Sequence, residues 1–210
     1  MIELSTAIKC PNVDTFLCTF KVFQHSLQKS EVMSRFFPEP LIANDISRFF
    51  AKIFYVKDMT HDEKTHIFGE IRSDLHKYIL KPQKEGGGNN YYNEEILKLL
   101  PPEGGDLENL NPVLKNSMIM ERINPPELET YVLHENKLKR ILSISELSVY
   151  GIVLSTAEKK MVINENAGYL VRTKDKSTQE GGIVSGFSAV DLPYLVDFKL
   201  EGANNLKFDN

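Results

Sequence analysis

The sequence predicts an all-α protein, in which a helical bundle is followed by a layered helical domain. Apolar residues recur at helical spacing in three consecutive segments, residues 13–35, 42–54 and 60–79. Capping residues precede these segments and prolines interrupt the chain around them. With 210 residues, 41% of them hydrophobic, the chain is long enough to bury a core without a disulfide or a metal.

The first two helices are predicted from apolar spacing. Residues 13–35 follow Asn12, a good helix cap, and Pro38 ends the segment. Residues 42–54 repeat the spacing with an aromatic face. At helical spacing, phenylalanines more often form a core than line a ligand cleft. We therefore assign five of them to the core: Phe16, Phe20, Phe49, Phe50 and Phe54.

The third helix begins with a capping box. The Thr60 hydroxyl can accept a hydrogen bond from the Glu63 amide, and the Glu63 carboxylate can accept one from the Thr60 amide. The apolar residues that follow at helical spacing are Ile67, Phe68, Ile71, Leu75 and Ile79. Three consecutive amphipathic helices predict a bundle over residues 1–80.

A polar, glycine-rich segment, residues 81–92, comes next and predicts a flexible loop. Its Gly86-Gly87-Gly88 run lacks a following Gly-Lys-Ser/Thr, and the helical interpretation places no strand before it. We therefore interpret the run as a linker rather than as a phosphate-binding loop. A second helical domain is expected over residues 93–210, either separate from the bundle or continuous with it.

Proline positions and apolar spacing divide this second domain into short elements. Residues 160–172 fit either a hairpin or a short helix, and residues 173–182 predict a loop. A final helix is expected to begin at Ser188. The other predicted helices cover residues 93–100, 112–122, 126–133 and 136–155.

Charge and hydropathy exclude several classes of protein. The net charge is −4, and no Lys/Arg-rich block is present to neutralise a phosphate backbone, so nucleic acid is not expected as a partner. No apolar run reaches the roughly 20 residues that span a bilayer. Residues 1–4 lack the basic start and apolar core of a signal peptide. A cytosolic protein is expected.

Motifs for metal, cofactor or covalent chemistry are weak. His61 and His66 are five residues apart, which places them on different faces of a helix rather than at zinc-ligand spacing. Residues 182–186 miss the spacing of a nucleophile elbow by one residue. We expect no metal, no cofactor and no catalytic chemistry on a substrate.

The last part of the chain carries the functional argument. In Ser188-Ala189-Val190-Asp191-Leu192-Pro193, one carboxylate lies near the start of an apolar segment that we interpret as a helix. Together with the predicted helix at Asn136–Leu142, this order resembles the vacuolar protein sorting nine (Rabex-type) family, the helical exchange factors for early-endosomal Rab GTPases. The similarity covers residues 60–205 loosely.

The match to that family has differences. Asp191 matches the second acidic position of the family pattern, and Leu192 with Pro193 matches its Leu-Pro. Val190 replaces the first Asp, and the aromatic position between Asp and Leu is missing. The family's later Gly-Tyr segment is absent too, so Tyr194 or another tyrosine would have to substitute for it.

The resemblance implies a guanine-nucleotide exchange factor for an endosomal Rab. Its Asp191 carboxylate would pair with the phosphate-loop lysine of the GTPase and displace GDP, without making or breaking a bond. The protein would be cytosolic and recruited to endosomal membranes, or delivered into a host cytosol if it is microbial. The implied GTPase-binding residues are Ser188, Leu192, Pro193, Tyr194, Leu195 and Val196.

Other interpretations stay open at this point. Ser188 and Asp191 are spaced as a capping box, which requires no function beyond helix capping. A catalytically silent helical adaptor would also fit the aromatic faces. A segment at Arg35–Ile42 echoes Rho-type GTPase-activating proteins, although residues 1–34 contain neither Gly nor Arg for their finger loop. The sequence leaves open which Rab is preferred and whether residue 210 is the natural end.

Overall fold

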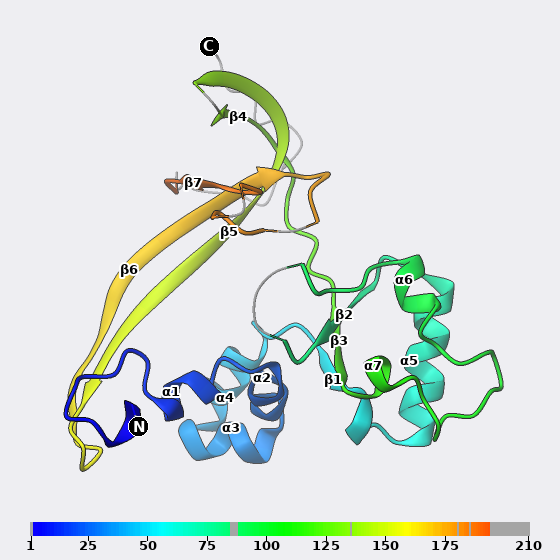
Figure 1. The fold of residues 1–210 in the computed structure, drawn as a ribbon, viewed down its shortest axis with the longest axis horizontal. Coiled ribbons are helices and arrows are strands. Elements are labelled where there is room, and N and C mark those ends of the chain that lie inside the picture. Colours follow the sequence, from blue (N-terminus) through cyan, green and yellow to red (C-terminus); the bar gives the residue numbers. More distant parts are fainter. Residues whose placement is uncertain (1, 85–87, 135, 180, 185, 194–210) are drawn as a thin grey trace. The chain divides into compact units, whose positions relative to one another are not determined.

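The computed structural model describes residues 2–84, 88–134, 136–179, 181–184 and 186–193 (Figure 1). It divides into two compact units, unit 1 at Met1–Asn124 and unit 2 at Pro125–Asn210. The predicted loop at 81–92 lies within unit 1, and its residues 85–87 fall outside the described residues. No helix in the described ranges is both long and apolar enough to cross a membrane.

Unit 1 begins with short helices and continues into a mixed helix and strand layer (Figure 1). Its strands form one antiparallel sheet in the order β1-β3-β2. The 3-10 helices are η1 (Ile2–Leu4) and η2 (Val56–Asp58). The α-helices are α1 (Val13–Leu17), α2 (Lys21–Leu27), α3 (Ser30–Phe36), α4 (Pro40–Ser47), α5 (His61–Ser73), α6 (Glu94–Leu97) and α7 (Pro112–Lys115). The strands are β1 (Ile53–Tyr55), β2 (Tyr78–Pro82) and β3 (Ser117–Glu121).

Unit 2 is built from antiparallel strands in the order β4-β5-β6-β7. Its two longest strands, β5 and β6, pair along most of their length and form a long hairpin (Figure 1). Asn136, with φ 58°, makes the turn between β4 and β5, a left-handed conformation that Asn tolerates. The four strands are β4 (Leu128–His134), β5 (Lys137–Ser155), β6 (Met161–Asp175) and β7 (Ala189–Asp191).

The all-α prediction is therefore wrong. The segment expected as a helix over residues 136–155 is strand β5, and the open choice at 160–172 resolves to β6 as part of a hairpin. Strand β5 is rich in serines and β-branched residues, and both residue types are less favourable in a helix than in an extended strand. The final helix expected from Ser188 does not begin there, because residues 189–191 form β7, and residues 194–210 lie outside the described residues.

Other predicted helices are shorter than expected or are strands. Residues 13–35 form three helices, α1 to α3, instead of one. Residues 42–54 and 112–122 each end in a strand, β1 and β3 respectively. Of the helices expected at 93–100 and 126–133, the first is reduced to α6 and the second is replaced by β4.

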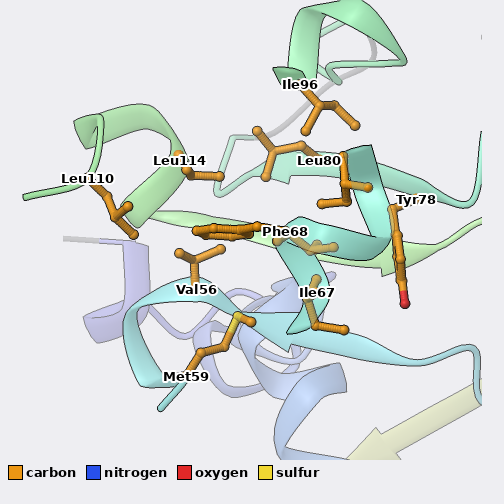
Figure 2. Packing of buried hydrophobic residues seen from close by; sticks show 11 residues of the cluster. Val56, Met59, Ile67, Phe68, Tyr78, Leu80, Ile96, Leu110 and Leu114 are labelled. Atoms are coloured by element: carbon orange, nitrogen blue, oxygen red, sulfur yellow. The ribbon is translucent and has the colours of Figure 1, made fainter. Parts of the chain in front are cut away.

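Helix α5 confirms the predicted capping box and organises the core of unit 1. The Thr60 hydroxyl accepts a hydrogen bond from the Glu63 amide at 3.2 Å, and the Glu63 carboxylate accepts one from the Thr60 amide at 2.8 Å. The buried face of α5 packs against the sheet, with Phe68 in the middle of the cluster (Figure 2). The cluster contains Val56, Met59, Ile67, Phe68, Ile71, Tyr78, Leu80, Ile96, Leu110, Leu114 and Ile119.

The predicted aromatic core lies elsewhere. None of the five phenylalanines assigned to it is buried, although Phe54 packs partly against the cluster around α5. Phe16 is 43% exposed and Phe49 is 90% exposed. Met33 is the one buried residue in the described helices α1 to α4. Their apolar faces therefore lie largely outside the core of unit 1.

Side-chain hydrogen bonds attach these helices to the sheet. His25 Nδ1 lies 3.0 Å from the Ile53 carbonyl. The Gln28 side chain donates to the Ala51 carbonyl at 2.6 Å and accepts from the Ile53 amide at 3.2 Å. Strand β1 is thus held on one side by β3 and on the other by α2.

We expect Phe68→Ala to lower the free energy of unfolding by about 3–5 kcal/mol, because a fully buried aromatic side chain leaves a cavity. Phe68 is 1% exposed, whereas Phe49 is 90% exposed. The matched control Phe49→Ala should change stability by less than about 0.5 kcal/mol. Urea unfolding followed by circular dichroism measures both, and equal effects would contradict the assigned core.

The end of α5 is tied to the start of β2 by Glu70. Its carboxylate accepts hydrogen bonds from Lys77 Nζ at 2.6 Å and from the Tyr78 hydroxyl at 2.5 Å. The Lys77 ammonium first, and the Tyr78 hydroxyl second, hold the pKa of Glu70 below its ordinary value of 4.5. Burial, followed by the same hydrogen bond, raises the pKa of Tyr78.

We expect Glu70→Gln to cost about 1 kcal/mol of stability at neutral pH, the upper end for a partly exposed ion pair. Because folding lowers the pKa of Glu70, the stabilisation from its ionised carboxylate is complete above pH 4.5. This stabilisation is lost as the pH falls through the pKa of Glu70 in the folded protein. Urea midpoints of wild type and variant should therefore converge in acid. Glu31→Gln on α3 serves as control, and a gap that persists at pH 2 would refute the linkage.

Candidate functional site

In unit 1, strand β2 leads directly into the glycine-rich segment. Lys81 lies near the end of β2, opposite Met118 of β3. The chain then leaves the sheet and returns at Tyr91, which exchanges two backbone hydrogen bonds with Leu80 at 3.1 and 2.9 Å. The two ends of the glycine-rich segment are therefore fastened together at the edge of a sheet.

The described part of this loop carries polar groups and a left-handed glycine. Gly88 has φ +78°, a conformation that strains other residues, and a Cβ there would meet nothing within 4 Å. Gln83 Nε2 is buried and has no hydrogen-bond partner among the described residues. Asn90 donates to the Tyr92 hydroxyl at 3.1 Å. The linker interpretation of Gly86–Gly88 assumed that no strand precedes the run, and β2 removes that assumption.

In unit 2, alternate residues of β6 place two cations on one face of the sheet. Arg172 lies directly opposite Glu146 of β5, and Lys174 is two residues further along the same face. An Arg172 Nη atom donates to Glu146 Oε1 at 2.5 Å, and Lys174 Nζ donates to the Gln179 carbonyl at 2.9 Å. We call the face that bears Glu146, Arg172 and Lys174 the cationic face.

One atom of Arg172 stands out on the cationic face. Its Nε is buried and has no hydrogen-bond partner within the described ranges. A buried N–H of a charged guanidinium without an acceptor is costly, so such a group marks a position where an acceptor from a ligand would be stabilising. The Glu146 carboxylate accepts a hydrogen bond from an Nη atom of the same guanidinium and so helps to hold it in place.

The opposite face of the same strands carries a chain of hydroxyl groups that ends at Asp191. Thr173 Oγ1 donates to Asp191 Oδ2 at 2.8 Å, and Ser145 Oγ lies 2.8 Å from the same Thr173 oxygen. Because the single proton of Thr173 is used on the carboxylate, Ser145 must be the donor to Thr173. Thr173 is only 2% exposed. We call the face that bears Ser145, Thr173 and Asp191 the hydroxyl face.

The structure thus places the predicted site residues on and beside a strand. Asp191 ends β7 and also accepts a hydrogen bond from the Leu192 amide at 2.8 Å. Ser188 donates to the Gly181 carbonyl at 3.0 Å rather than capping a helix. Leu192 is 83% exposed and Pro193 is half-buried. The remaining three predicted residues, Tyr194, Leu195 and Val196, lie outside the described residues.

Residue types for metal binding do not gather in the part of the chain that the structure describes. No group of three or more His, Cys, Asp or Glu side chains lies close enough together there to hold an ion.

Comparison with protein families decides what kind of protein this is. Residues 3–195 match the family model for the eukaryotic glutathione synthase ATP-binding domain. The chain belongs to this family. The expected membership of the vacuolar protein sorting nine family is wrong, and the exchange-factor function fails with it, together with its adaptor and Rho-type alternatives.

Individual relatives agree. The chain is 34% identical over 200 residues to the chloroplastic glutathione synthetase of Solanum lycopersicum, with 93% of this chain covered and 34% of that protein. It is 30% identical over 201 residues to the glutathione synthetase of Dictyostelium discoideum, with 93% and 40% covered. The chain therefore spans about a third to two fifths of the length of these relatives.

A solved structure shows the same fold. The glutathione synthetase-like effector of Globodera pallida, in its apo form, superimposes with a TM-score of 0.63 at 23% identity. The match covers 93% of this chain and 38% of that chain. The comparisons therefore do not support a Rab GTPase as the partner. The expectation of a regulator that is not an enzyme is also wrong, because the relatives are synthetases, which are ligases.

Sequence reasoning missed the cationic face. Arg172 and Lys174 lie in a segment where the chain alternates, with Val171 and Thr173 on one side and Arg172 and Lys174 on the other. That period of two was the available signal for a strand. The expected loop at residues 173–182 divides this alternating segment and so conceals the strand.

We expect Thr173→Val to destabilise the protein by about 1–3 kcal/mol, because Asp191 and Ser145 both lose their hydrogen-bond partner on the hydroxyl face. Thr130→Val in β4 is the matched control, since Thr130 is half-buried and makes no side-chain hydrogen bond within the described ranges. Chemical denaturation of the two variants measures the difference. Equal stabilities would show that the hydroxyl chain contributes nothing.

Proposed function

We propose that this chain is the ATP-binding portion of a glutathione synthetase and that it binds phosphate groups of ATP through Arg172 and Lys174 of unit 2. The observation that carries the proposal is the Arg172 Nε, which has no partner among the described residues, on a face that also holds Lys174. This guanidinium belongs to a chain that matches the family model of an ATP-binding domain.

The chemistry of a triphosphate favours such a face. Phosphate oxygens accept charge-assisted hydrogen bonds, and the planar guanidinium of arginine offers two parallel donors to them. The Glu146 carboxylate engages one Nη of Arg172, and Nε has no acceptor among the described residues. Glu146 thus orients the guanidinium, while Lys174 adds a second positive charge two residues away.

The glycine-rich loop of unit 1, taken by itself, has features of a second anion-binding segment. Successive backbone N–H groups in glycine-containing turns form concave anion sites. Gly88 already has the positive φ that such turns use, and Lys81 and Lys84 precede it in sequence. Two backbone hydrogen bonds between Leu80 and Tyr91 tie the ends of the loop together.

Ligation is a further step beyond nucleotide binding. The relatives are named glutathione synthetases, and more than half of each lies outside the region matched here. We therefore propose ATP binding for this chain itself, and synthesis of glutathione only for this chain together with the portion that completes such an enzyme.

The test is titration of the full chain with a fluorescent ATP analogue in magnesium-containing buffer. Arg172→Met should weaken binding about tenfold or more, since a hydrogen bond to a charged group contributes roughly 1.5–3 kcal/mol. The matched control is Arg140→Met, which removes an arginine from the same face of the same sheet. Arg140 pairs with Glu129 and is exposed.

Two results would refute the proposal. One is equal affinity of wild type and Arg172→Met for the analogue. The other is equal weakening by Arg172→Met and Arg140→Met, which would indicate a general effect of charge rather than a specific contact.

A further inference from the structure

Thr173 lies between the two cations of the cationic face in sequence, but its side chain is on the hydroxyl face. Successive residues of a strand point to opposite sides, so Arg172 and Lys174 share one face of β6 and Thr173 belongs to the other. The Thr173 hydroxyl donates to Asp191 Oδ2 at 2.8 Å, and its oxygen lies 2.8 Å from Ser145 Oγ. The side chains of three adjacent strands are therefore joined directly behind the cations.

The backbone at Arg172 has a neighbouring strand on each side. Arg172 lies opposite Glu146 of β5 and opposite Val190 of β7. Strand β7 has only three residues, Ala189–Asp191, so its backbone hydrogen bonds to β6 are few. Asp191 lies opposite Val171 and reaches Thr173 diagonally, two residues along the same face. This side-chain bond therefore adds an attachment that the short strand needs.

We propose that Thr173 and Asp191 are positioning residues for nucleotide binding. They do not touch the ligand, and their hydrogen bond fixes the stretch of β6 that carries Arg172 and Lys174. The inference rests on the proposed function of these two cations. A binding group performs well only when its supporting shell holds it within about 0.5 Å of the productive geometry. Glu146 holds the guanidinium end of Arg172, and the Thr173–Asp191 bond holds the adjacent backbone.

A role in stability alone leads to a different expectation. If the Thr173–Asp191 bond only stabilised the fold, its removal would lower the free energy of unfolding, but the molecules that remain folded would bind nucleotide as tightly as wild type. If the bond positions the cations, folded molecules bind nucleotide more weakly. In that case the loss also depends on the presence of Arg172, because Thr173 acts through it.

The experiment titrates the full chain with the fluorescent ATP analogue and magnesium, at a temperature where circular dichroism shows every variant to be folded. Thr173→Val, which removes the hydroxyl at nearly constant size, should weaken binding about fivefold, within the range of couplings between residues of one hydrogen-bonded network. Asp191→Ala, which removes the acceptor, should weaken binding in the same direction. Thr173→Ser keeps the hydroxyl and should bind within about twofold of wild type.

A double-mutant cycle separates positioning from stability. In the Arg172→Met background, the loss caused by Thr173→Val should shrink to about twofold or less. The matched control is Thr130→Val on β4, which makes no side-chain hydrogen bond within the described ranges and should bind the analogue as wild type does.

Three results would overturn the inference: wild-type affinity of folded Thr173→Val, no rescue by Thr173→Ser, or the same loss with and without Arg172. If Arg172→Met itself binds as tightly as wild type, the proposed function fails and the positioning role fails with it. If Arg172→Met binds weakly while Thr173→Val does not, only the positioning role fails.

Discussion

The antiparallel pairing of β5 with β6 is the interaction on which unit 2 depends. Its register sets Ser145 opposite Thr173 and Glu146 opposite Arg172, and so divides the residues between two faces. A slip of one residue would exchange the faces and bring Arg172 into the position of a buried hydroxyl. The hydrogen bonds from Ser145 to Thr173 and from Thr173 to Asp191 therefore specify the register as well as stabilise it.

In unit 1 the corresponding constraint is the core around α5. Phe68 and its neighbours hold β2 against the helix, and the bonds between Leu80 and Tyr91 close the loop that β2 leads into. The capping box fixes where α5 starts, and Glu70 joins its last turns to β2. The position of Lys81 thus follows from helix capping and core packing several residues away.

The capping box at Thr60 could be predicted because both partners are local and only three residues apart. Strand β5 could not be distinguished from a helix by apolar spacing alone, since Leu138, Ile141 and Leu142 fit an amphipathic helix as well as a strand. What decides the matter is pairing with β6, a contact between distant segments.

The C-terminal motif failed for a related reason. The Ser188 and Asp191 pair has the spacing of a capping box, yet both side chains are used in tertiary contacts, with Gly181 and Thr173 respectively. The interpretation of the glycine-rich loop as a linker assumed that no strand precedes it, and β2 removes that assumption. Of the candidate site, the glycines were visible in the sequence, whereas the cationic face required the pairing of β5 with β6.

The two faces of β6 support each other. For Arg172 and Lys174 to bind phosphate as proposed, β6 must be fixed in place, because a side chain is positioned only as well as its backbone. The buried Thr173 lies between these two cations in sequence and is bonded toward strands on both sides, β5 and β7. Asp191, which the sequence analysis placed at the centre of the functional site, is in the fold the last acceptor in the hydrogen-bonded series Ser145, Thr173, Asp191. Asp191 lies on the hydroxyl face, opposite the cationic face. Its carboxylate accepts the hydrogen bond that helps to fix β6, and β6 carries Arg172 and Lys174.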